Sequence, residues 1–200
     1  MGLISNGTTL LDAGALDSDI PTGDMILLST ATASSSATLD FTSGINSTYK
    51  EYIFKYTDIH PQTDTANFSF QADTGTNTNY NQNVTSTFFQ AIHAEGDGSE
   101  EVTYNTGNEL GQANGFQIIA ETANADADGC IAGFLHLYEP SNTSKVKHFN
   151  TNSEYNQASN LCMNVFAAGY FNTATAITRV RFKMSSGNID AGTIKMYGIK

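Results

Sequence analysis

Apolar and polar residues alternate along most of this chain. In the segment 179–184, Val180, Phe182 and Met184 alternate with three basic residues. A period of two places successive side chains on opposite faces of a β-strand. The segment therefore predicts a strand that buries its three apolar side chains in a core and leaves its basic face outside.

The same period recurs between turn-rich pieces that contain Gly, Asn, Asp and Pro. It predicts strands over 25–31, 38–41, 52–57, 67–71, 86–94, 116–121, 130–138, 145–151, 161–171, 179–184 and 193–199. Helical periodicity is short, and only 9–16 and part of 103–113 could each form one short helix. The pattern therefore indicates an all-β protein.

The number of strands favours a jelly-roll-like antiparallel β-sandwich, because two Greek keys use eight strands and leave few exposed edges. The low charged fraction of 14% fits a protein of strands and turns, since amphipathic helices usually raise that fraction. An immunoglobulin-type sandwich is disfavoured, because the chain has no Trp. We expect one β-sandwich domain over residues 25–200.

Residues 1–24 lack the alternation and are predicted to form an N-terminal arm outside this domain. The arm carries scattered apolar side chains at Leu3, Ile4, Leu10, Leu11 and Leu16. Terminal segments of this kind are often ordered only against a neighbour. Two interpretations stay open, an anchor for another subunit and an edge strand that folds back on its own domain.

The charge of the chain excludes several classes of partner. With 20 acidic and 9 basic residues, the net charge is −11, so phosphate backbones and anionic lipid repel the chain. The N-terminus lacks the pattern of a signal peptide, and no apolar stretch is long enough for a membrane span. We therefore expect synthesis in a cytoplasm, no nucleic-acid partner and no membrane insertion.

The two cysteines, Cys130 and Cys162, both lie in apolar runs. Free cysteine usually behaves as a small buried hydrophobe, and cytosolic synthesis keeps thiols reduced. We expect two buried thiols, while a disulfide between them stays open because the spacing alone does not decide it.

One segment partly matches a calcium-binding loop. Residues 124–129 occupy the first six positions of such a loop, with Asn124, Asp126, Asp128 and Gly129 at positions one, three, five and six, but Leu135 stands where the bidentate Glu is needed. We interpret the segment as an acidic turn between strands and expect no metal there.

The sequence contains no catalytic signature. Its four histidines are not paired at metal-ligand spacing, and it has no Gly-x-Ser-x-Gly elbow, no Walker loop and no Gly-x-Gly-x-x-Gly. These histidines are His60, His93, His136 and His148. We therefore expect a protein that is not an enzyme, with no catalytic residue, no cofactor and no metal.

Five tyrosines lie in or beside polar turns, where an amphipathic ring could stack on a sugar or face a neighbouring subunit. They are Tyr80, Tyr104, Tyr138, Tyr155 and Tyr197. Ordinary cross-strand packing is the alternative, and the use of aromatic residues in strands favours it.

The C-terminal segment 185–199, with Asp190-Ala191-Gly192-Thr193-Ile194-Lys195-Met196-Tyr197-Gly198 at its centre, resembles the C-terminus of a family of small structural proteins of tailed bacteriophages, abundant in marine phages. Segments 3–9, 47–52, 133–137 and 168–173 are similar to that family too. Gly192 and Gly198 in the terminal motif would allow close backbone approach or bulges, with Ile194 and Met196 facing the core.

The resemblance implies an all-β, jelly-roll-like fold and a place on the outside of the virion, as a head decoration, fibre or tail-associated subunit. It implies other virion proteins and further copies of this chain as partners. A receptor-binding tail-fibre module that recognises a host-surface glycan is the alternative. The resemblance carries over no catalytic or metal-binding residue.

Overall fold

The computed structural model describes residues 3–5, 7–12, 15–16 and 25–200, and every regular element among them is a β-strand. The strands form a three-stranded sheet near the N-terminus and a separate thirteen-stranded sheet, with antiparallel pairing throughout. The all-β antiparallel fold predicted from the alternating pattern is confirmed.

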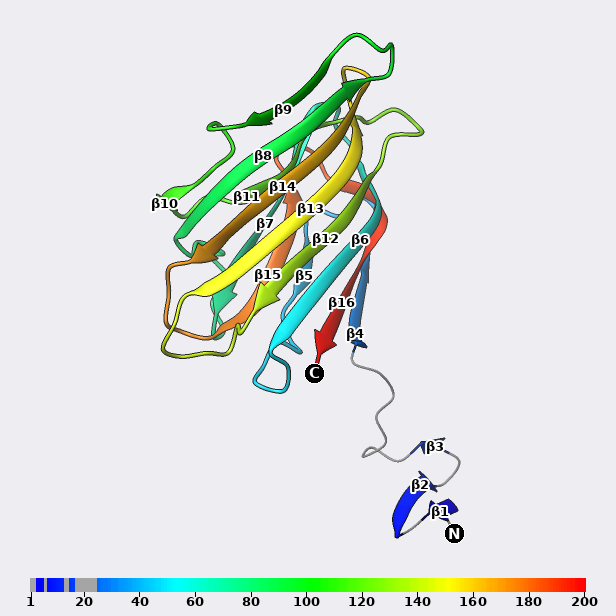
Figure 1. Cartoon of the computed structure of the whole chain (residues 1–200), viewed down its shortest axis with the longest axis vertical. Helices are drawn as coiled ribbons and strands as arrows, with labels where there is room; N and C mark the ends of the chain where they lie inside the picture. The colour runs from blue at the N-terminus through cyan, green and yellow to red at the C-terminus, as the bar shows by residue number, and fades with distance from the viewer. Residues whose placement is uncertain (1–2, 6, 13–14, 17–24) are drawn as a thin grey trace.

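The larger sheet folds into two layers, which Figure 1 shows one behind the other. The front layer has the order β4 (Met25–Thr32), β16 (Ile189–Ile199), β6 (Glu51–Pro61), β12 (Ile131–Tyr138), β13 (Lys147–Gln157), β14 (Leu161–Phe171) and β8 (Val84–Ala94). Two short strands, β9 (Glu100–Tyr104) and β10 (Gly111–Ala113), pair with β8. The back layer contains β11 (Gln117–Ala123), β7 (Ala66–Thr74), β15 (Ile177–Met184) and β5 (Leu39–Phe41).

Two contacts connect the layers. β11 meets the end of β13 through the pair Ala123 and Gln157, and an isolated bridge joins Ser36, in the connection between β4 and β5, to Ile189 at the start of β16. The result is a β-sandwich that is nearly closed. Strands β12, β13 and β14 follow one another as neighbours in one layer, so the front layer is wider than the four strands of a simple jelly-roll sheet.

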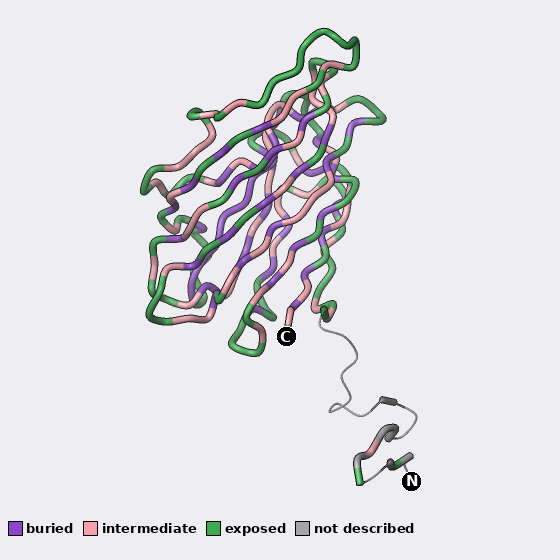
Figure 2. The backbone as a smooth tube through the Cα atoms, in the orientation of Figure 1, coloured by how far each residue is buried: buried purple, intermediate pink, exposed green. Residues whose placement is uncertain are grey.

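Aromatic side chains fill the space between the layers. Phe182 on β15 lies at the centre, with ring centroids of the surrounding aromatic residues 5.7 to 6.5 Å away. These neighbours are Phe41, Phe54, Tyr56, Phe68 and Phe70. Figure 2 shows the resulting pattern, in which buried positions alternate with exposed ones along the front strands.

The core face predicted for 179–184 is confirmed, because Val180, Phe182 and Met184 are 1%, 0% and 4% exposed. The basic side chains lie on the opposite face, where other segments partly cover them. Arg181 forms a two-point ion pair with Asp40, with nitrogen–oxygen distances of 2.8 and 2.5 Å. Its guanidinium also lies 4.0 Å from the centre of the Tyr80 ring, a cation–π contact that helps to bury this tyrosine.

The short helices considered for 9–16 and 103–113 are wrong. The structure places β2 (Thr8–Asp12) and β3 (Ala15–Leu16) in the small sheet, beside β1 (Leu3–Ser5). In the second region β9 and β10 both pair with β8, with a turn between them in which the Asn105 side chain accepts a hydrogen bond from Gly107 N. Strand pairing overrides the weak local helical pattern in both places.

The glycines of the C-terminal motif have the packing role expected of them. Gly192 has a φ of +112°, and a Cβ there would lie 2.5 Å from the carbonyl oxygen of Asp58. A Cβ at Gly198 would lie 2.5 Å from the ring of Tyr49. Ile194 and Met196 between them are fully buried, as predicted. The motif therefore lets β16 pack closely against β6 and its preceding turn.

Candidate functional site

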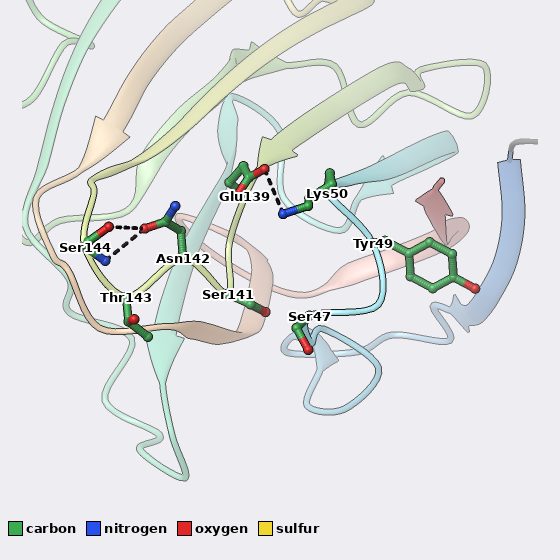
Figure 3. A pocket seen from close by; sticks show the side chains of 8 residues that line it. All are labelled: Ser47, Tyr49, Lys50, Glu139, Ser141, Asn142, Thr143 and Ser144. Carbon is green, nitrogen blue, oxygen red and sulfur yellow. Dashed lines mark hydrogen bonds and ion pairs between the residues drawn. The ribbon is translucent and has the colours of Figure 1, made fainter.

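One hollow on the described surface lies at one end of the sandwich, between the turn that precedes β6 and the loop that follows β12. Figure 3 shows the residues that line it. Its volume is about 310 Å³. Its lining is mainly hydroxyl and amide groups, from Ser47, Tyr49, Lys50, Glu139, Ser141, Asn142, Thr143 and Ser144. Because these two segments are far apart in the sequence, periodicity along the chain gave no signal for this loop pocket.

Hydrogen bonds within the 139–145 loop fix its shape. The Oδ1 atom of Asn142 accepts hydrogen bonds from Ser144 N at 2.8 Å, Ser144 Oγ at 3.0 Å and Lys145 N at 3.0 Å. Lys50 and Glu139 form an ion pair at 3.3 Å between the two segments. Both side chains are well exposed, so this ion pair contributes little to stability.

The lining of the loop pocket contains no serine–histidine pair. None of its lining residues is a histidine that could accept a proton from one of its hydroxyl groups. The Tyr49 ring points away from the 139–144 loop in Figure 3, toward β16 and β4, so it does not offer a face to a ligand in the pocket. The groups present suit weak hydrogen bonding to a small polar molecule.

A second hollow, of about 510 Å³, lies where the 124–130 turn meets β6 and β16, and its lining includes Asp58, His60, Asp128, Cys130 and Asp190. His60 contacts Asp126 O at 3.0 Å through Nε2 and lies 3.8 Å from Asp190 through Nδ1. Across the described residues, no three His, Cys, Asp or Glu side chains are placed to hold one metal ion.

The partial calcium motif forms a tight turn beside this hollow. The Asn124 side-chain oxygen accepts a hydrogen bond from Asp126 N at 2.7 Å, and Gly129 N donates to Asp126 O at 2.7 Å. One oxygen that a cation would need is therefore already used within the turn. The absence of a calcium site at Asn124, Asp126 and Asp128 stays a prediction.

The prediction of buried thiols is wrong, because both Cys130 and Cys162 are free and exposed. Cys162 lies on β14 between the partly buried Leu161 and the fully buried Met163. Met163, Val165 and Ala167 alternate on the buried face, so Cys162 falls on the outer face. This alternation predicts an exposed Cys162, whereas the apolar composition of the run suggested a buried one.

Thiol titration of the folded protein tests this exposure. We expect an aromatic disulfide reagent at neutral pH to modify both cysteines without denaturant. Cys130 should react more slowly than an unperturbed thiol, since partial burial, Asp58 and Asp128 raise its pKa and reduce the thiolate fraction. Modification of fewer than two thiols before denaturant is added would contradict the structure.

The five candidate tyrosines divide into two groups. Tyr80 and Tyr155 are 2% and 6% exposed, so packing explains both. Tyr104 is 49% exposed, and Tyr138 and Tyr197 are half-buried on the outside of the front layer. These three remain available for contact with a ligand or a neighbouring subunit.

The four histidines lie apart and contact different groups. His136 pairs with Glu51 across β12 and β6, His93 lies 3.7 Å from Asp97, and the His148 ring meets Tyr170 edge to face. With His60 in the acidic hollow, each histidine has a local structural partner.

Comparison with known proteins finds no matching family model, no matching curated protein and no matching solved structure. Over the part of the chain that the structure describes, no helix has the length and apolar character of a membrane span.

Proposed function

We propose that this chain is a non-enzymatic structural subunit on the outside of a tailed-bacteriophage particle, where residues 1–24 attach it to a neighbour. The observation that carries the attachment is the separation of the two sheets. Among the described residues, β1, β2 and β3 pair only with one another and form no ladder with the sandwich. The side chain of Ile4 on β1 is 59% exposed.

An exposed apolar side chain on a small sheet favours burial against a partner. A three-stranded sheet of this size buries little apolar area of its own, and contact with a second surface would stabilise it by about 25 cal/mol per Å² of apolar area. The partners on this proposal are other virion proteins and further copies of the chain. The resemblance of the terminal motif to phage structural proteins supports the virion as the location, after synthesis in the bacterial cytoplasm.

A truncated chain that begins at Met25 tests the attachment. We expect it to remain folded, with a thermal midpoint close to that of the full chain, because among the described strands those of the sandwich pair only with one another. We expect the truncated chain to fail to bind particles assembled without this protein, whereas the full chain binds them. Co-sedimentation of the added protein with the particles measures this. Unfolding of the truncated chain would assign residues 1–24 to the core, and normal incorporation would exclude them as the anchor.

Recognition of a host-surface glycan is the second candidate function. The observation that favours it is a set of large aromatic side chains exposed on the outer face of the front layer, among them Phe89, Tyr104 and Phe166 at 43%, 49% and 40%. Exposed aromatic rings that lie together mark surfaces that contact other molecules. The two candidate functions are compatible in one subunit, because they use different parts of the chain.

A further inference from the structure

One row of side chains crosses the outer face of the front layer, perpendicular to the strands. The strand registers place Tyr104 on β9 opposite Phe89 on β8, and Phe89 opposite Phe166 on β14. The row continues through Asn152 on β13 to Phe134 on β12. Since neighbouring strands lie about 4.8 Å apart, these five side chains form a continuous strip. We refer to these five residues as the aromatic row.

The rings of the aromatic row are held in fixed positions. The Phe89 and Phe166 rings are stacked, with centroids 5.0 Å apart and an angle of 12° between their planes. The hydroxyl group of Tyr104 donates a hydrogen bond to Glu109, which orients that ring. Phe134 meets the ring of His136 edge to face, with centroids 4.9 Å apart. Phe89, Phe166, Tyr104 and Phe134 all stand on paired strands, and each ring has a neighbour that fixes its orientation. Little side-chain freedom therefore remains to be lost when a ligand binds.

Hydrogen-bonding groups lie beside the rings. Asn152, between Phe166 and Phe134 in the row, donates from Nδ2 to Asn164 Oδ1 at 3.1 Å, and Asn164 donates to Glu154 Oε1 at 3.3 Å. This chain of contacts orients both amides along β13 and β14. Among the described residues, no side-chain hydrogen bond reaches the Asn152 amide oxygen or the second carboxylate oxygen of Glu154. Acceptors next to aromatic faces are thereby available to a ligand.

The charges near the row identify the class of ligand. The row contains no charged side chain. The carboxylates of Glu109 and Glu154, which repel anions, lie beside the part of the row on β9, β8, β14 and β13, and Lys55 lies at its other end, opposite Phe134 in the register of β12 with β6. The same carboxylates disfavour a second copy of this chain, whose net charge is −11. A sugar ring offers an apolar C–H face to an aromatic ring and hydroxyl groups to amides and carboxylates, so an uncharged glycan satisfies both halves of the surface.

We propose that the aromatic row is a binding surface for a neutral polysaccharide that lies across the strands. The sugar faces stack on the rings of Phe89, Phe166 and Tyr104, and the hydroxyl groups bond to Asn152 and Glu154. The inference rests on the second candidate function and specifies its site and ligand. It places that site on the rigid sheet, whereas the loop pocket has no aromatic face directed into it.

The experiment uses the full chain on a printed array of neutral and anionic microbial glycans, followed by titration calorimetry with the neutral glycan that binds best. We expect binding to at least one neutral glycan, and an affinity that changes little when ionic strength rises from about 0.1 to 1 M, because no ion pair is formed. Phe166→Ala and Asn152→Ala should each weaken binding about tenfold or more, equivalent to about 1.4 kcal/mol. Asn142→Ala, in the loop pocket, should leave the affinity unchanged.

Three results would overturn the proposal. The first is that the full chain binds no neutral glycan on the array. The second is that Asn142→Ala abolishes binding while Phe166→Ala does not. The third is that the full chain sediments as an oligomer and that Phe166→Ala converts it to a monomer. The last result would assign the row to contacts between copies. Incorporation of the Phe166→Ala variant into particles distinguishes the glycan-binding proposal from the virion proposal. The virion proposal predicts normal incorporation of this variant whether or not it binds the glycan.

Discussion

Replacing Phe182 by alanine should lower the free energy of unfolding by about 3–5 kcal/mol, the range for removal of a fully buried phenylalanine. The ring is 0% exposed and contacts aromatic side chains from both layers of the sandwich. Its loss leaves a cavity that five large rings cannot close without leaving their rotamers. Equilibrium unfolding in urea, followed by fluorescence and circular dichroism together, measures the change.

Phe166→Ala is the matched control for this experiment. That side chain is also a phenylalanine on a central strand, but it is 40% exposed and stacks on one neighbour. We expect it to cost less than about 1.5 kcal/mol, the value of one aromatic pair. Equal losses for the two variants would mean that the core is not centred on Phe182.

Alkaline solution should unfold this protein in a region of pH set by its buried tyrosines. Burial raises the pKa of Tyr56 and Tyr155 well above the ordinary value of 10.0. The folded state therefore keeps protons that the unfolded state releases above pH 10.0. Their contribution is fully present below that pH and is lost as the pH rises toward the folded values, at about 1.4 kcal/mol per pH unit for each group.

Tyr56→Phe isolates one part of this dependence. The Tyr56 hydroxyl lies 2.6 Å from Ser153 Oγ, so the variant should lose about 1 kcal/mol at neutral pH. Above pH 10 its stability should fall less steeply than that of the wild type, by one tyrosine's share of about 1.4 kcal/mol per pH unit. Urea midpoints between about pH 9 and pH 11.5 give both slopes. Burial also lowers the pKa of Lys147, and this changes the pH dependence of stability. The change is the same in the wild type and in Tyr56→Phe, so it cancels when their slopes are compared. Parallel slopes would show that Tyr56 ionises as freely in the folded state as in the unfolded state.

Much of the fold could be read from the sequence because the physical signal is local. A strand buried on one face must alternate, and the phase of the alternation assigns each residue to a face. The segment predicted over 161–171 coincides with β14 (Leu161–Phe171), and the buried face of 179–184 is the one expected. The cysteines show what happens when composition is used instead of phase, since Cys162 lies in an apolar run yet points outward.

Other features depend on contacts that no local pattern encodes. Lys147 is fully buried, because its amine reaches the carbonyl oxygens of Lys145 and Thr173 at 2.5 and 3.1 Å. The loop pocket and the aromatic row both combine segments that strand pairing brings together. Phe166 and Phe89 could each have been assigned to an outer face by phase, but their stacking follows only from the register between β14 and β8.

The position of Met25 determines how the subunit would carry a mechanical load. A pull on residues 1–24 enters the sandwich at Met25, at the end of edge strand β4, whose register partner is Ile199 at the end of β16. Tension between the two termini would separate these strands one pair at a time from that end. Tension between Met25 and the outer face of β14 would leave the C-terminus unloaded, so Ile199 would not be drawn away from Met25. The β4–β16 pairing is therefore most vulnerable to a load that acts on both termini.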